Sequence, residues 1–414
     1  MYYLGLVLLV ISTVFVWIIK KDIWFPGIMV GLLWTFVYIL LISTSLYVDY
    51  SSTIYLYVSF CVIVFEWVSV ATSFVKIRDE KKSEYIKCIS YRHIDLTIAI
   101  LVCCFLAYII NVALVLLRNF SGITAIVFTL KYAQVTGKLS TGLIPYVATF
   151  SFVFTSFLIY ITYNSEERYQ GFLKSRMKFT LVLSLLYAVF LLGRVFILQW
   201  AIASLGMFVF SSHIDKEKVR KLVIRAGIAL LVLFILYGIS KFFYRLKDMS
   251  IQEMIDDTIS VYVAGPLVGM QLLLNRGIGT QRAKATFDFF YSFLNIFGFS
   301  FQHYNRISYM SLGPTESLYG NVYTAFYYWI VDYGYIGTFI LYQIFSILHT
   351  RLYLFSKKKK TGFYYTLTAF AMYPLLMQFF DEQYLTQISL LIQILVWSNL
   401  IYKTNLYIVE RGKI

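Results

Sequence analysis

The sequence is poor in charged residues and in helix breakers. Only 14% of its 414 residues are Asp, Glu, Lys or Arg, and it holds only 5 prolines and 22 glycines. What remains are long apolar runs, which give a mean hydropathy of +0.73. No soluble domain of this length sustains such a composition. We therefore predict an all-α polytopic membrane protein, because lipid offers a spanning backbone no hydrogen-bond partner outside its own helix.

Several catalytic motifs are also missing. The sequence contains no GxxxxGK[ST] phosphate loop, no GxSxG nucleophile elbow and no HExxH metal pair. The DxD motif with which sugar-nucleotide transferases hold a divalent ion is absent too, since Asp256 and Asp257 are adjacent rather than alternating. We expect no nucleotide-sugar donor, no bound metal and no other cofactor.

Cysteine is scarce, with four residues in the whole chain. Cys61, Cys103 and Cys104 lie in apolar runs and Cys88 lies in a basic loop. No pair is therefore placed for an outer-side disulfide or a CxxC metal site. The N-terminal apolar run lacks a small-residue cleavage site, so we expect it to be retained as a span.

Apolar runs of the length needed to cross a bilayer, about 20 residues, recur along the chain. We predict eleven spans: 2–19, 27–46, 53–75, 94–116, 143–162, 179–192, 195–211, 222–240, 333–353, 362–380 and 383–402. They define an N-terminal transmembrane bundle of eight spans (1–240), one large outer loop (241–332), and three C-terminal spans with a tail (333–414).

Basic residues are concentrated in alternate loops, which hold 25 of the 36 Lys and Arg residues. Because Lys and Arg are retained on the cytoplasmic side of short loops, this pattern places the N-terminus outside and the C-terminus in the cytoplasm. The net charge of +15 is thus explained by topology. We expect no nucleic-acid partner, because these charges are spread over six loops rather than gathered on one face.

The loop 241–332, about ninety residues long, is by far the largest segment outside the spans. Its run 253–275 is predicted to be an amphipathic helix interrupted at Gly265-Pro266, since proline cannot donate to the helix ladder. A second helix is predicted over 283–297, and Gly313-Pro314 indicates a turn. The loop is too aromatic for a disordered tether, so we expect a cap folded on the membrane.

Three short motifs stand out against this scaffold. Gly193-Arg194 lies at the turn between two predicted spans, and YVAGP occupies 262–266. The third and most specific motif is NVYTAFYYWIVDYGYIG, residues 321–337, which runs into the span at 333. Together with the many-span scaffold and the single large outer loop, these motifs resemble O-antigen and capsule repeat-unit polymerases, the Wzy family of membrane glycosyltransferases. The resemblance covers most of the chain but not the region 277–320.

The resemblance implies glycosyl transfer on the outer face of the bacterial cytoplasmic membrane. A growing glycan on undecaprenyl diphosphate would pass to the non-reducing end of a new lipid-linked repeat unit, releasing undecaprenyl diphosphate. The product would be O-antigen of lipopolysaccharide or capsule. The partners implied are the lipid-linked oligosaccharide, membrane lipid, a chain-length regulator and a flippase.

A diphosphate leaving group needs fixed cations, and arginine binds phosphate oxygens bidentately. Arg194 is the first candidate, because a charge that interrupts an apolar stretch is expensive unless it is used; Arg276 and Arg282 follow. The alternative for Arg194 is an arginine that snorkels to the headgroups. For the loop arginines the alternative is simple solvation or pairing with an acid.

An acceptor hydroxyl needs a base within hydrogen-bond reach, and the candidates are Glu316, His303 and Asp332. The candidate substrate-binding residues are Tyr262, Asn321, Tyr323 and Thr324. Several of these have a structural alternative as well. Asn321 and Thr324 could cap the following helix, Asp332 could face its dipole, and Gly334 and Gly337 suit close helix packing.

Other functions remain open. Glu66, inside the third predicted span, is either functional or neutral and hydrogen-bonded. An O-antigen ligase would share the scaffold and the donor but differ in the loop motifs. A lipid-linked oligosaccharide flippase or other transporter would be expected to show internal repeats and more charges within its spans.

Overall fold

The computed structural model describes the chain except residues 78–83, 120–129, 131–138, 140–141, 192–193, 212–220, 222–249, 278–282, 303–309, 316–317, 405 and 414. Four candidate site residues are affected. Arg282, His303 and Glu316 lie outside the described residues, and only the backbone of Arg194 is described. The predicted span 222–240 also lies outside them.

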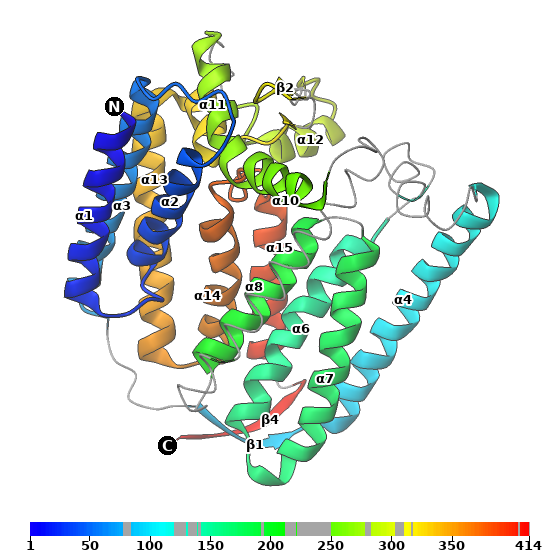
Figure 1. Ribbon diagram of the computed structural model, residues 1–414. Helices are drawn as coiled ribbons and strands as arrows, with labels where there is room; N and C mark the ends of the chain where they lie inside the picture. Colours follow the sequence, from blue (N-terminus) through cyan, green and yellow to red (C-terminus); the bar gives the residue numbers. More distant parts are fainter. Residues whose placement is uncertain are drawn as a thin grey trace. The chain divides into compact units, whose positions relative to one another are not determined.

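The described part is mostly helical (Figure 1). Its helices are α1 (Tyr2–Lys20), α2 (Pro26–Ile42), α3 (Thr53–Phe74), α4 (Tyr91–Asn119), α6 (Ile144–Asn164), α7 (Glu167–Phe190), α8 (Arg194–Ser211), α10 (Ile251–Ile259), the π-helical turn η2 (Ser260–Ala264), α11 (Gly265–Asn275), α12 (Asp288–Ile296), α13 (Ala325–Lys359), α14 (Gly362–Met377) and α15 (Ile388–Lys403). Strand β1 (Glu84–Ile89) pairs antiparallel with β4 (Ile408–Lys413), and β2 (Met310–Ser311) with β3 (Tyr319–Gly320).

Helices occupy each of the ten predicted span ranges that fall in the described part of the chain. Six helical segments are long and apolar enough to cross a membrane: Tyr2–Lys20, Thr53–Phe74, Tyr91–Arg118, Ile144–Asn164, Ile255–Asn275 and Ala325–Lys359. These segments identify a helical membrane protein. One of them, Ile255–Asn275, falls in the region for which the sequence predicted an outer loop and no span.

The chain forms two compact units, each assembled from distant segments. Unit 1 contains Met1–Arg78, Arg225–Leu354 and Tyr373–Ser389. Unit 2 contains Asp79–Ile224, Phe355–Met372 and Leu390–Ile414. This division cuts across the predicted ranges 1–240 and 333–414, because it follows contacts in space rather than order along the chain.

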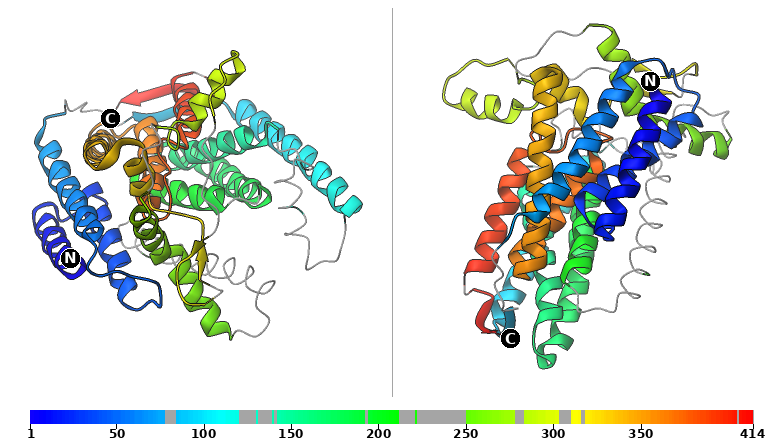
Figure 2. Two further views of the ribbon diagram at one scale, coloured as in Figure 1. Left: turned by 90° about the horizontal axis from the view of Figure 1, so that it is seen from above. Right: turned by 90° about the vertical axis from the view of Figure 1, so that its left-hand side faces the viewer.

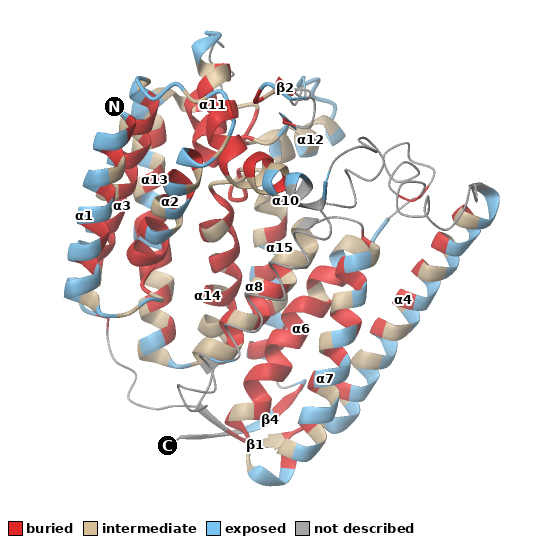
Figure 3. Cartoon of the chain, viewed as in Figure 1, coloured by how far each residue is buried: buried red, intermediate tan, exposed pale blue. Residues whose placement is uncertain are grey.

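Unit 2 is organised around α6, which packs against α4, α7 and α8. Its Phe154, Phe157 and Leu158 are completely buried, so helix α6 is covered over most of its surface (Figure 3). A helix that is apolar on all sides is expected in such a central position. The β1–β4 pair and α15 complete this unit.

Unit 1 begins with α1, α2 and α3, which lie side by side (Figure 2). Small residues allow the close approach: a Cβ on Gly31 would lie 1.9 Å from Oε1 of Glu66. The buried Glu66 carboxylate accepts hydrogen bonds from the hydroxyls of Ser12 and of Thr13, the latter at 2.7 Å. This geometry agrees with the hydrogen-bonded alternative for Glu66.

The predicted break at Gly265-Pro266 is wrong. The helix continues from α10 through η2 into α11, with helical dihedral angles at Gly265 (φ −55°, ψ −39°). The widened π turn explains why. The Gly265 N–H donates to the carbonyl of Ser260, and the next residue, Pro266, has no N–H that would need an acceptor. Helix α10 starts with a capping box formed by Ser250 and Glu253.

Helix α13 folds back on itself at Gly334, whose dihedral angles (φ 69°, ψ 179°) are not helical. In a straight helix Phe326 and Tyr342, sixteen positions apart, would be separated by about 24 Å along the axis. Their ring centroids are instead only 4.8 Å apart. The rings of Trp329 and Phe345 are also stacked, at 5.5 Å. Residues 325–333 therefore form a short arm that lies against the long arm, rather than a straight entry into a span.

Candidate functional site

The motif segment 321–324 packs on helix α11. The Thr324 side chain is fully buried, and its hydroxyl donates to Sδ of Met270 at 3.2 Å. Tyr323 is 1% exposed and lies against Gly269, where an added Cβ would come within 2.8 Å of Cδ1 of the Tyr323 ring. Gly269 therefore permits a contact that a larger residue would prevent. The buried side chains of Tyr323 and Thr324 therefore anchor this segment to α11.

The β2–β3 hairpin joins this segment to the YVAGP motif. The predicted turn at Gly313-Pro314 is confirmed, since residues 313–315 form the bend that connects the two strands. The side chain of Leu312 would lie 2.9 Å from a Cβ on Gly265 and 2.6 Å from one on Gly320. One leucine thus fills the space between the YVAGP motif and Gly320, the residue just before the 321–337 motif.

This assembly is tied to the end of α3 that follows the loop 43–52. The amide N–H of Tyr47 donates to the carbonyl of Leu312 at 2.7 Å. Gln271 accepts hydrogen bonds from the Tyr55 hydroxyl at 2.5 Å and from the Asp49 N–H at 3.2 Å. The loop 43–52 is therefore linked to α11 in two ways. Asp49 binds Gln271 directly, and Tyr47 binds Leu312, whose side chain lies against Gly265.

Asp332 anchors a second part of the large loop. Its buried carboxylate accepts three hydrogen bonds: from the Ala285 N–H at 3.2 Å, from the Thr286 N–H at 2.8 Å and from the Thr286 hydroxyl at 2.7 Å. The turn 283–286, which precedes α12, is thereby fixed to the short arm of α13. The helix predicted over 283–297 begins only at Asp288 for this reason.

The remaining described candidates lie nearer the surface. Asn321 and Arg276 are exposed, and Arg276 is the C-terminal capping residue of α11. Arg276 makes no ion pair with any described residue. Tyr262 is half-buried, with its ring centroid 6.1 Å from that of Phe380. The structure thus places Tyr323 and Thr324 against α11, about one turn after the YVAGP segment. The short arm of α13 separates them from Asp332.

The sequence reasoning missed the turn between α14 and α15. Its Glu382 is 1% exposed and accepts hydrogen bonds from the N–H groups of Tyr384, Leu385 and Thr386, at 2.9, 2.9 and 2.7 Å. Burial raises the pKa of this carboxyl, and the three donors oppose the rise. The predicted span 383–402 is therefore shortened to α15, which starts at Ile388. The signal was present as the polar run DEQYLTQ at 381–387.

The same turn also supports the motif segment. The N–H of Ala325, the first residue of α13, donates to the carbonyl of Gln378 at 2.9 Å. The Tyr342 hydroxyl donates to Oε1 of Gln378 at 2.6 Å, and the Trp329 ring lies 5.8 Å from that of Tyr384. Both arms of α13 are therefore held by one buried polar turn.

Among the residues that the structure describes, no group of three or more His, Cys, Asp or Glu side chains could hold a metal ion. Comparisons of the chain with models of protein families, with curated proteins and with solved structures find no match.

Proposed function

We propose that this protein polymerises undecaprenyl-diphosphate-linked oligosaccharide repeat units on the outer face of the cytoplasmic membrane. The anomeric carbon of the growing chain is attacked by a hydroxyl of the incoming unit, and undecaprenyl diphosphate leaves. The observation that carries the proposal is the packing of Tyr323 and Thr324 on α11, the helix that begins at Gly265 of the YVAGP segment. We take these two segments, identified separately in the sequence, as parts of one site.

The outer location follows from the loop 43–52, which the distribution of basic residues places outside. Hydrogen bonds from Tyr47, Asp49 and Tyr55 connect that loop and the start of α3 to Leu312 and Gln271. Helix segment 255–275 would then lie along the outer surface rather than cross the membrane. The reading of eleven spans with one large outer loop is part of this proposal.

The candidate residues have different roles in the proposed reaction: arginines bind the diphosphate, and acids or a histidine act as base or position the loop. Arg276 is exposed at the end of α11, where its guanidinium is accessible to a diphosphate. Arg194, at the start of α8, remains the first candidate for the leaving group, and Arg276 and Arg282 are the second choices. Asp332 is engaged by three donors, so we assign it to positioning the loop and keep Glu316 and His303 as candidate bases.

The test uses purified protein in lipid with one synthetic undecaprenyl-diphosphate repeat unit and no added nucleotide or metal. A ladder of polymer on a gel is expected. Arg194→Ala should reduce its rate about a hundredfold, as expected when a group that stabilises developing charge is removed. Arg92→Ala, an exposed arginine at the start of α4, is the matched control and should leave the ladder unchanged.

The outcomes separate the rival functions. A ladder that survives Arg194→Ala supports the polymerase and overturns the role of Arg194. If the folded protein makes no ladder from its native repeat unit, the polymerase is contradicted and a ligase or a flippase takes its place.

A further inference from the structure

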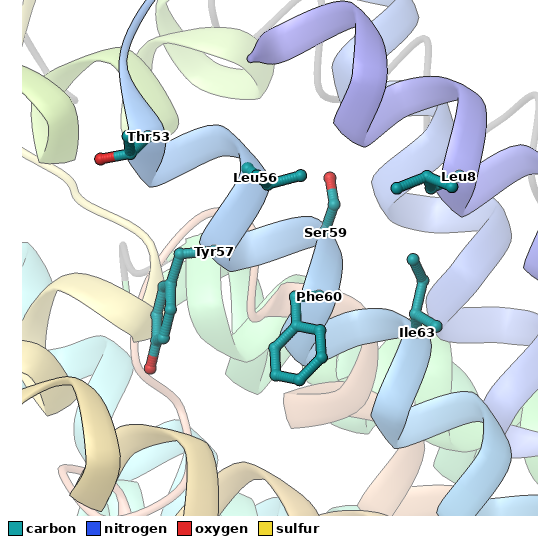
Figure 4. A pocket seen from close by; sticks show the side chains of 7 residues that line it. All are labelled: Leu8, Thr53, Leu56, Tyr57, Ser59, Phe60 and Ile63. Carbon is teal, nitrogen blue, oxygen red and sulfur yellow. The ribbon is translucent and has the colours of Figure 1, made fainter.

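A groove of about 400 Å³ lies in unit 1 on the faces of α1 and α3 (Figure 4). Its lining residues are Leu8, Thr53, Leu56, Tyr57, Ser59, Phe60 and Ile63. None of these carries a charge. Leu8 is 42% exposed and Phe60 is 53% exposed, so the groove is open to the surface of the unit.

The groove is continuous with an exposed apolar surface on α1. Both α1 and α3 are long and apolar enough to cross a bilayer. Leu4, Val7 and Ile11 of α1, next to Leu8, are exposed apolar residues as well. A soluble partner would leave this surface unexplained, whereas a hydrocarbon chain matches a groove that has no charge and opens into lipid.

The groove starts at an end of its helix and runs inward. Thr53 is the first residue of α3, and Ile63 lies ten residues later, a distance of about 15 Å along the axis. That is half of the hydrocarbon thickness of about 30 Å. A lipid chain in the groove would therefore have its headgroup near Thr53 and its tail in one leaflet. By the charge distribution, that leaflet is the outer one.

The wall of the groove is shared with the fold-back of α13. The Tyr57 hydroxyl donates to the carbonyl of Tyr335 at 2.6 Å, and the two rings lie 5.0 Å apart. The Phe60 ring is stacked on that of Phe339, at 5.6 Å. A chain that fills the groove thus contacts the two side chains that hold α3 against the residues following Gly334.

We infer that this groove holds the polyprenyl chain of the lipid-linked substrate. The inference rests on the proposed function, because the groove wall contacts Tyr335 of the motif segment 321–337, to which that reaction is assigned. Three observations carry it: the uncharged lining, the exposed apolar residues of α1 beside its opening, and the direct contact of Tyr57 with the fold-back.

The test is photo-crosslinking of the full chain in phospholipid nanodiscs that contain undecaprenyl diphosphate without any sugar. Leu8→p-benzoylphenylalanine places the reactive group in the groove. Phe15→p-benzoylphenylalanine, at 55% exposure on the same helix but outside the groove, is the matched control. Mass spectrometry then gives the ratio of polyprenyl to phospholipid adducts at each position.

We expect this ratio to be about tenfold higher at position 8 than at position 15, which corresponds to a preference of about 1.4 kcal/mol. Equal ratios, or phospholipid adducts alone at position 8, would overturn the inference. Since the probe carries no sugar, the result does not depend on polymerisation. A positive crosslink with no polymer ladder would retain the groove and contradict the proposed reaction.

Discussion

Gly334 determines the course of the motif segment. Its combination of φ 69° and ψ 179° is accessible almost only to glycine. No neighbouring atom lies within 4 Å of where its Cβ would be. The requirement for glycine is therefore one of backbone conformation, and the sequence-based reading of Gly334 as a close-packing residue is incorrect.

Gly334→Ala is expected to destabilise the protein by about 1–3 kcal/mol through backbone strain alone. Gly171→Ala is the matched control, because that glycine also has no atom within 4 Å but lies in α7 with an ordinary φ. In a helix, alanine is preferred to glycine by about 1 kcal/mol, so the control should be stabilised. Unfolding in detergent would measure both, and a neutral Gly334→Ala would contradict the fold-back.

Asp332 offers a second test at this scale. Asp332→Ala leaves the buried N–H groups of Ala285 and Thr286 without their acceptor, at a cost of about 1–3 kcal/mol for each. Asp95→Ala removes only an exposed ion pair with Arg176 and should cost about 0–1 kcal/mol. Equal unfolding temperatures for Asp332→Ala and wild type would exclude an anchoring role.

The turn between α14 and α15 shows how one carboxylate can organise an element. Three consecutive N–H groups converge on Glu382, and the carbonyl of Gln378 in the same turn receives the N–H that starts α13. Such a turn replaces a helix end without leaving buried donors unpaired. The polar residues 381–387 thus form the turn that joins α14 to α15, and each of these helices has 16 residues.

Glu382 should make stability depend on pH. Its folded-state pKa is raised above the ordinary value of 4.5, so its favourable contribution is full at low pH and is lost as pH rises through the folded pKa. Relative to Glu382→Gln, the wild type should therefore gain stability as the pH is lowered from neutral toward 4.5. The measurement is the difference in unfolding temperature across this range, and a difference that shrinks toward acid would contradict the assignment.

The sequence predicted the positions of individual helices better than the places where the chain reverses direction. Apolar runs located the helices because hydrophobicity along the chain is a local property, and Gly313-Pro314 located its turn for the same reason. The fold-back at Gly334 depends on contacts such as Phe326 with Tyr342, which no local pattern contains. The same holds for the contact of Thr324 with Met270, whereas the polar run at 381–387 could have revealed its turn.

At the scale of the whole molecule, the distribution of charge predicts the orientation. Basic residues occupy alternate loops from Lys20 to Lys413, and this arrangement predicts that the loop 43–52 is outside and the loop after α13 is inside. The proposed reaction depends on this orientation, because Tyr47 and Asp49 connect the outer loop to the motif assembly.

Single cysteines at Ser51 and Lys360, both exposed positions, test the orientation in a background without the four native cysteines. A membrane-impermeant maleimide should label Ser51→Cys in intact cells. Lys360→Cys should react only after the membrane is permeabilised. The reverse pattern would place the motif assembly in the cytoplasm and remove the basis for an outer-face reaction.

The most direct measurement of the proposed reaction is the amount of undecaprenyl diphosphate released as purified protein in lipid consumes a synthetic lipid-linked repeat unit. A polymerase must release one undecaprenyl diphosphate for each glycosidic bond that it forms, and we predict this ratio together with lengthening glycans. Consumption or movement of the repeat unit with no release of undecaprenyl diphosphate would contradict the account.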